Sequence, residues 1–162
     1  MFGPRLRLYR VSGISVMVDA SWFLVAGLVT WTLAEGLFPR DHPGLARPTA
    51  WAMGVAAALG LFLSILLHEL GHALMARRVG LRIRAITLFI FGGLAEMEDE
   101  PRSARAEFLV AVAGPAVSLA PIALSLLVGL VCRLVPPPDA RLAADVCFYV
   151  AWANGLLIAF NA

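Results

Sequence analysis

The 162-residue sequence has no lysine, only two cysteines and few charged side chains of either sign. Charged residues make up 15% of the chain, whereas a soluble domain carries about a quarter. A net charge of +2 is too small to indicate nucleic-acid binding. Cys132 and Cys147 fit neither a disulfide framework nor a cysteine-type zinc site. These shortages argue against a soluble globular domain, a nucleic-acid-binding protein and a disulfide-rich secreted fold.

Apolar residues are what the chain has in excess, at 60% of the sequence and a mean hydropathy of +0.84. One small core cannot bury them all, so the predicted solvent is a lipid bilayer. Four apolar stretches approach the roughly 20 residues that a membrane-spanning helix needs. They are residues 20–38, 50–77, 106–132 and 143–162. The last is still apolar at the final residue, so we expect a helix that the end of the sequence cuts short.

Two shorter pieces have β-strand patterns. Residues 5–18 alternate polar and apolar side chains around Ser12-Gly13, which predicts a hairpin at the membrane surface. Residues 85–95 are too short to span, rich in β-formers and interrupted by Gly92-Gly93. They predict a re-entrant strand or loop beside the second helix, with a surface strand as the alternative. The predicted fold is a single all-α polytopic membrane unit over residues 1–162, with about four transmembrane helices, this hairpin and this β segment.

Arginines predict the orientation of the spans. Nine fall in the N-terminal segment and after the second span, and four in the other connections. The nine are Arg5, Arg7, Arg10, Arg77, Arg78, Arg82, Arg84, Arg102 and Arg105, and the four are Arg40, Arg47, Arg133 and Arg141. Positive charge concentrates in cytoplasmic loops. We therefore expect a multi-pass cell-membrane protein whose N-terminus and whose end of the second span are cytoplasmic.

The second span ends in His68-Glu-Leu-Gly-His72. On a helix, His68 and His72 lie on one face and can share one metal ion, with Glu69 one step round. This is the HExxH pattern of zinc peptidases, in which glutamate is the general base that activates zinc-bound water. Ionisable groups in a membrane helix are functional candidates, because burying them in lipid is costly. The structural alternative is an interfacial polar cluster that caps the helix, and close helix packing explains Gly71.

The stretch LFLSILLHELGHALMARRVGLRIRAITLFIFGGLAEMEDEPRSARAEFLVAVAGPAVS resembles the site-2 protease family of intramembrane zinc metalloproteases. It is most similar to the prokaryotic branch whose members often carry CBS domains. The resemblance implies that Zn²⁺ is held by His68 and His72, with Glu69 as the catalytic base. It also implies transmembrane substrates, and CBS-domain regulation in a full-length protein. Asp19 departs from the pattern, since relatives usually carry histidine there, and we read it only as an interfacial polar position.

The resemblance leaves the third zinc ligand outside the sequence. In the family it is an aspartate in a stretch N-x-x-P-x-x-P-L-D-G, whose first asparagine matches Asn161, so the aspartate is expected beyond Ala162. A catalytic zinc normally takes three protein ligands. The sequence offers three internal alternatives, each with a simpler explanation. One is an acidic run typical of a solvated face, formed by Glu96, Glu98, Asp99 and Glu100. The others are Glu107, which caps the third span, and Asp145, which is expected on the opposite side of the membrane. We therefore expect a truncated and inactive piece of a protease.

Substrate binding is assigned to three further residues. A substrate helix must unwind before cleavage, and a strand over residues 86–91 could pair with the unwound segment. Gly92 and Gly93 would permit close approach of that backbone. By resemblance, Asn161 would help to hold the substrate. Gly114-Pro115 would bend the third span or, more simply, serve its packing.

Two other classes of function compete with the protease. A non-catalytic membrane zinc-binding pseudoprotease would use the groove without cutting, and the intact Glu69 argues against it. A metal transporter should show further His, Asp or Glu residues facing the core of other spans. None occurs in residues 108–132.

Overall fold

The computed structural model describes residues 5–11, 13–89, 92–97 and 103–161. The helices are α1 (Ala20–Thr32), the π-helix η1 (Leu33–Leu37), α2 (Phe38–Asp41), α3 (Arg47–Arg78), α4 (Ala104–Leu134) and α5 (Pro138–Asn161). The strands are β1 (Arg5–Val11), β2 (Ile14–Asp19), β3 (Ile83–Phe89) and β4 (Gly92–Met97).

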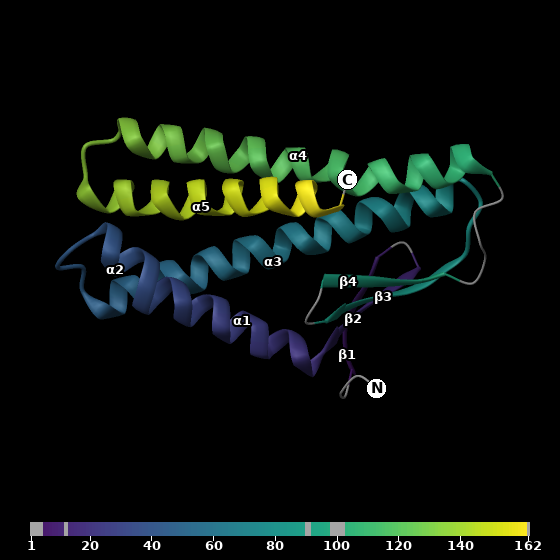
Figure 1. Ribbon diagram of the computed structural model, residues 1–162, viewed down its shortest axis with the longest axis horizontal. Coiled ribbons are helices and arrows are strands. Elements are labelled where there is room, and N and C mark those ends of the chain that lie inside the picture. The colour runs from purple at the N-terminus through teal and green to yellow at the C-terminus, as the bar shows by residue number, and fades with distance from the viewer. Residues whose placement is uncertain (1–4, 12, 90–91, 98–102, 162) are drawn as a thin grey trace.

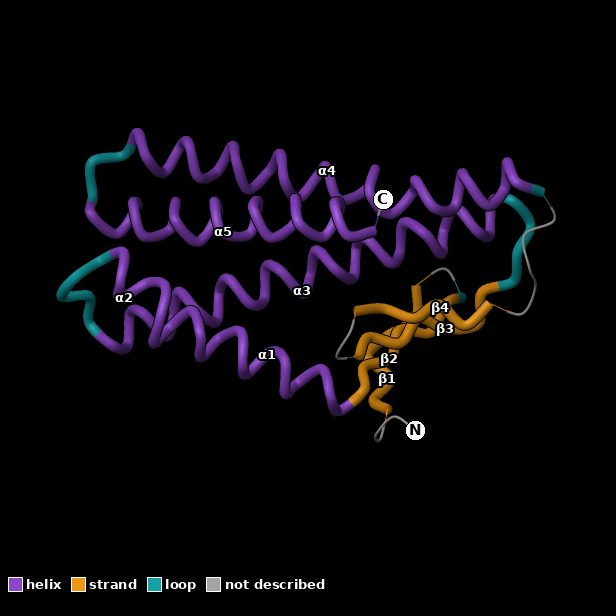
Figure 2. The backbone as a smooth tube through the Cα atoms, viewed as in Figure 1, coloured by secondary structure: helices purple, strands orange, loops and turns teal. Residues whose placement is uncertain are grey.

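Helix α3 is the centre of the molecule. It packs against α1 on one side and against α4 and α5 on the other, and the sheet lies along one end of it (Figure 1). Figure 2 shows the division into a helical layer and one small sheet. The described residues include four segments long and apolar enough to cross a membrane: Ala20–Asp41, Arg47–Arg78, Ala104–Leu134 and Asp139–Asn161. The expected fold class of a mostly helical, multi-pass membrane protein is confirmed.

The β segments form one four-stranded sheet in the order β1-β2-β3-β4. The pairs β1–β2 and β3–β4 are antiparallel, and β2–β3 is parallel. The sequence predicted a hairpin over 5–18 and a separate β segment over 85–95. The second segment is itself a hairpin, and it joins the first through the β2–β3 pairing. That pairing brings Val16 opposite Ile86, about 70 residues away, so no local pattern could reveal it.

Apolar side chains hold the sheet against α3. Ile14, Val16 and Val18 of β2 alternate with less buried residues and pack with Ile86 and Leu88 of β3. Leu66 and Ala73 of α3 complete this cluster. The sheet is therefore anchored along the same stretch of α3 that carries the HELGH sequence.

Local hydrogen bonds set where the helices begin and end. Asp19 caps α1, its Oδ1 accepting a hydrogen bond from the Ser21 amide at 2.9 Å. Hydrogen bonds from Ser21 lower the pKa of the Asp19 carboxyl. Asp19, which the sequence indicated only as an interfacial polar position, therefore caps a helix in the structure. Helix α3 ends in a turn in which the amides of Gly80 and Leu81 bond the carbonyls of Arg77 and Ala76.

The first span is not one regular helix. It passes through the five-residue π-turn η1 before continuing as α2. Glu35 in this turn accepts hydrogen bonds from Arg47 at 2.9 Å and from the Trp51 indole at 2.7 Å. The only acidic residue within the predicted 20–38 helix is thus paired with the start of α3.

Candidate metal and catalytic site

His68 and His72 face each other on α3. Their Nε2 atoms are 3.0 Å apart and their rings are 4.7 Å apart, edge to face. His68 is fully buried and His72 is half-buried. The helical spacing of four residues therefore produces the facing pair that the sequence predicted.

The opposite nitrogen of each ring is held by α4. His72 Nδ1 lies 2.7 Å from the carbonyl oxygen of Val110, and His68 Nδ1 lies 2.9 Å from the hydroxyl of Ser118. A carbonyl can only accept, so Nδ1 of His72 is the donor in this contact, and in a neutral imidazole the lone pair is then on Nε2. This arrangement orients ring nitrogens toward a shared ligand, as partners of metal-bound histidines do. Sequence reasoning missed both partners.

Two glycines allow α3 and α4 to come this close. A Cβ atom on Gly71 would lie 2.8 Å from the Ala113 carbonyl oxygen, so the packing explanation for Gly71 fits the structure. A Cβ atom on Gly114 would overlap the imidazole of His72. Gly114 and Ser118 are four residues apart, so they present one face of α4 to the two histidines. That spacing was the available signal for Ser118.

Glu69 lies against β4. A Cβ atom on Gly93 would overlap the Cγ and Cδ atoms of Glu69, so the glycine makes room for the carboxylate. Gly92 has a φ of +124°, and no atom of the described residues lies within 4 Å of its Cβ position. We expected both glycines to serve substrate binding. In the structure, Gly93 also makes room for the Glu69 side chain.

The strand expected to accept substrate has no free edge. Residues 86–89 belong to β3, which pairs with β2 on one side and β4 on the other. The prediction that this strand receives an extended peptide is wrong for that reason. Within the described residues, β4 is the outer strand next to β3, and its second edge has no strand partner.

Of the third-ligand candidates, Glu107 and Asp145 are described, and neither forms a metal-binding group with the two histidines. Glu107 lies in the first turn of α4, where Ser103 is the cap and accepts from the Ala106 amide. Asp145 pairs with His42 at 2.9 Å and with Arg133 at 2.6 Å. The side chain of Glu96 and all of residues 98–102 lie outside the described part. Among the residues that are described, no group of three His, Cys, Asp or Glu side chains could hold a metal.

Asn154 ties α5 to α3 one turn before His68. Its Nδ2 donates to Ser64 Oγ at 2.9 Å and to the Val150 carbonyl at 2.8 Å, and the side chain is fully buried. Helices α3 and α5 run in the same direction (Figure 1). Asn161 lies seven residues beyond Asn154, so it stands near the level of His72, with its Nδ2 bonded to the Leu157 carbonyl.

The two histidines fit a zinc ion. Two nitrogens on one tetrahedral zinc, each bonded at about 2.0–2.1 Å, lie about 3.4 Å apart. The observed Nε2–Nε2 separation of 3.0 Å is within a few tenths of an ångström of that value. Imidazole nitrogens are also the ligands that zinc commonly takes.

Comparison with known proteins gives the family. Residues 56–161 match the model of peptidase family M50. The protein named "Putative zinc metalloprotease sll0528" from Synechocystis is 46% identical over 114 residues, covering 70% of this chain and 30% of that protein. "Putative zinc metalloprotease Rip3" from Mycobacterium tuberculosis is 36% identical over 155 residues, covering 95% and 38%.

A solved structure shares the fold. The site-2 protease from Methanocaldococcus jannaschii superposes with a TM-score of 0.58 at 24% identity, covering 94% of this chain and 63% of that one. The matched part of the chain spans well under half the length of each of the two relatives named above. The family match covers α3 from residue 56 onward, β3, β4, α4 and α5, and so includes His68, Glu69, His72 and their contacts on α4 and β4. The chain belongs to peptidase family M50, the site-2 protease family.

Proposed function

We propose that this chain is the zinc-binding core of an intramembrane metalloprotease that hydrolyses peptide bonds of transmembrane substrates. His68 and His72 are its zinc ligands and Glu69 is its general base. The observation that carries the proposal is the facing Nε2 pair, with each ring fixed from α4 and with Glu69 one residue away beside β4.

The length of α3 supports a site below the membrane surface. Its 32 residues span about 48 Å at about 1.5 Å per residue. A helix of that length centred on a bilayer crosses the hydrocarbon core of about 30 Å and both headgroup layers. His68 then lies about 8 Å from the midplane, inside the hydrocarbon core but nearer one surface. Water has a short path to that depth.

The residues of the chain have distinct roles in the reaction. When bound, zinc polarises the scissile carbonyl and lowers the pKa of water toward about 7. Glu69 accepts a proton from the attacking water and returns it to the leaving amide nitrogen. Ser118 and the Val110 carbonyl keep His68 and His72 aimed at one point. Gly93 leaves the space in which the Glu69 carboxylate sits.

Strand β4 is the proposed place for the unwound substrate. Its outer edge can offer main-chain hydrogen bonds that lipid cannot supply. Gly93 places this strand next to Glu69, so a peptide added to it would run beside the general base. Gly92 leaves open space for a substrate side chain, and Asn161 approaches the same level from α5.

Strand addition can be tested by disulfide trapping. A cysteine at Ala95 of β4 should cross-link to a cysteine near the cleavage site of an engineered single-span substrate, in an E69Q background that prevents turnover. A cysteine at Arg7 of β1, the opposite edge strand, is the matched control. Equal cross-linking at both positions would remove β4 as the substrate strand.

The distribution of arginines supports the orientation. In the described part of the chain, eight of the 13 arginines lie in β1, at the C-terminal end of α3, in the connection to β3, in β3 or in the first turn of α4, which are all at one end of the protein (Figure 1). We propose that this end is cytoplasmic. A membrane-impermeant thiol reagent should label a cysteine at Arg78 only after cells are opened, and labelling of intact cells would reverse the orientation.

The protease itself is tested by separating zinc binding from cleavage. The sample is the full-length protein, because the chain spans only 30% and 38% of its two relatives. H68A and H72A should lose zinc by elemental analysis. E69Q should keep zinc and lose cleavage of single-span reporter substrates. E107Q, an acidic residue outside the site, is the control and should keep both.

The same variants separate the pseudoprotease from the protease. If E69Q preserves the cellular function of the protein while H72A abolishes it, the site binds zinc without cutting. If E69Q abolishes that function together with cleavage, the protease stands.

A further inference from the structure

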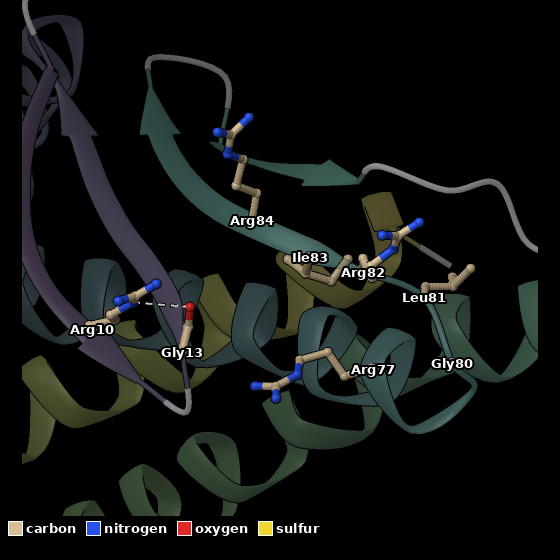
Figure 3. Close-up of a pocket in the computed structure, with 8 residues that line it drawn as sticks. All are labelled: Arg10, Gly13, Arg77, Gly80, Leu81, Arg82, Ile83 and Arg84. Carbon is tan, nitrogen blue, oxygen red and sulfur yellow. Dashed lines mark hydrogen bonds between the residues drawn. The ribbon is translucent and has the colours of Figure 1, made fainter.

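A cavity lies at the C-terminal end of α3, away from the histidines. It has a volume of about 450 Å³, within the range typical of ligand pockets. Four arginines line it (Figure 3): Arg10 from β1, Arg77 from α3, Arg82 from the connection between α3 and β3, and Arg84 from β3. No acidic residue is among its lining residues in the part of the chain that the structure describes.

We propose that this cavity binds the phosphate group of an anionic ligand, and that the natural ligand is the headgroup of an anionic phospholipid. Guanidinium groups pair with phosphate through charge-assisted and often bidentate hydrogen bonds. Four of them, from β1, α3, β3 and the connection before β3, make a cationic rim that has no part in the zinc site.

The backbone around the cavity is fixed on two sides. Arg10 Nε donates to the Gly13 carbonyl at 3.1 Å, which holds its guanidinium beside the β1–β2 turn (Figure 3). On the other side, the C-terminal turn of α3 at Gly80 is closed by the amides of Gly80 and Leu81. Both glycines have positive φ angles, +85° at Gly13 and +87° at Gly80, where other residues are strained. The turns that border the cavity are therefore defined by the sequence.

The depth of the cavity matches lipid headgroups. With α3 centred on the bilayer, Arg77 lies about 22 Å from the midplane. The headgroup layer of a typical bilayer ends about 20–22 Å from the midplane. This placement holds for either orientation of the protein.

The lining also favours an amphiphile over a soluble anion. Leu81 and Ile83 contribute apolar surface between the arginines. Leu81 is buried and Ile83 packs against the core of the sheet. A phospholipid carries apolar acyl chains, joined to its phosphate through the glycerol, whereas inorganic phosphate has no apolar group.

The test is a lipid titration of the full-length protein in detergent, followed by native mass spectrometry. The probes are dioleoylphosphatidylglycerol, dioleoylphosphatidylcholine and inorganic phosphate. The pocket variant is R10Q/R84Q. The matched control is R7Q/R78Q, which also removes one exposed arginine of β1 and one from a neighbouring element, outside the cavity. R84Q alone guards against a folding defect in the double variant, and zinc content reports that the site elsewhere is intact.

Phosphatidylglycerol should bind at least tenfold more tightly than phosphatidylcholine. R10Q/R84Q should weaken it at least tenfold, R84Q by an intermediate factor, and R7Q/R78Q less than threefold. Inorganic phosphate that binds alone, with the same loss in R10Q/R84Q, would support the phosphate site and assign it to a soluble phosphate ester. Equal weakening by the two double variants would overturn the proposal, because the attraction would then be a property of the whole basic surface. So would the absence of binding by both anionic probes.

Discussion

Replacing Ser118 by alanine should weaken zinc binding without breaking the fold. The Ser118 hydroxyl lies 2.9 Å from His68 Nδ1, and both side chains are fully buried. Without the hydroxyl, Nδ1 has no partner, and an unsatisfied buried polar group costs about 1–3 kcal/mol. At about 1.4 kcal/mol per factor of ten, that cost corresponds to a loss of roughly 5- to 150-fold in zinc affinity. Losses of about 10- to 100-fold are usual when the partner of a metal-bound histidine is removed.

The assay is competition for zinc between the full-length protein and a chelator of known affinity. S64A is the matched control, because Ser64 is also buried but bonds Asn154 and the Gly60 carbonyl instead of a histidine. It should lower thermal stability and leave zinc affinity within about threefold. An S118A protein with unchanged zinc affinity would refute the reasoning, since Ser118 would then not orient a ligand.

Three further predictions concern other parts of the structure. G114A should lose most of its zinc, because the added methyl group overlaps the His72 ring. G155A is the control and should bind zinc normally, because a methyl group there meets no described atom within 4 Å. Elemental analysis of the two variants checks this. The hydrogen bonds at Asp19 lower its pKa, so its contribution to stability is present above about pH 4 and is lost as pH falls through the lowered value. Thermal melting of D19N should therefore depend less on pH below about 4 than melting of the wild type. D145N should lower the free energy of unfolding by roughly 1 kcal/mol, because its carboxylate joins a histidine and an arginine and is only 24% exposed, and added salt should reduce the difference.

Hydropathy was sufficient to predict the helices. The predicted span 50–77 is observed as Arg47–Arg78, and 106–132 as Ala104–Leu134. Lipid forces every backbone amide in these runs to bond within the segment, so composition and length leave few alternatives. The π-turn in the first span was not predictable, because it depends on where Glu35 meets Arg47 and Trp51.

The facing histidines followed from local geometry, whereas their surroundings did not. The spacing of His68 and His72 places two rings on one helix face whatever the rest of the chain does. The partners come from α4, about 40 to 50 residues further along, and no periodicity relates them to α3. The space that the Glu69 side chain occupies is provided by Gly93 of β4, and the position of β4 depends on the whole sheet.

The sequence by itself determined that the chain is suited to a lipid bilayer, where its membrane-spanning helices lie, and that the two histidines of HELGH share a helix face. Hydrophobic burial and helical periodicity act over neighbouring residues, so these features can be derived locally. Only the tertiary structure decided which strands lie at the edges of the sheet, which groups of α4 hold the imidazoles, and that arginines distant in the sequence line one cavity. These features depend on contacts between segments far apart in the chain, and such contacts exist only after α3, α4 and the sheet have packed together.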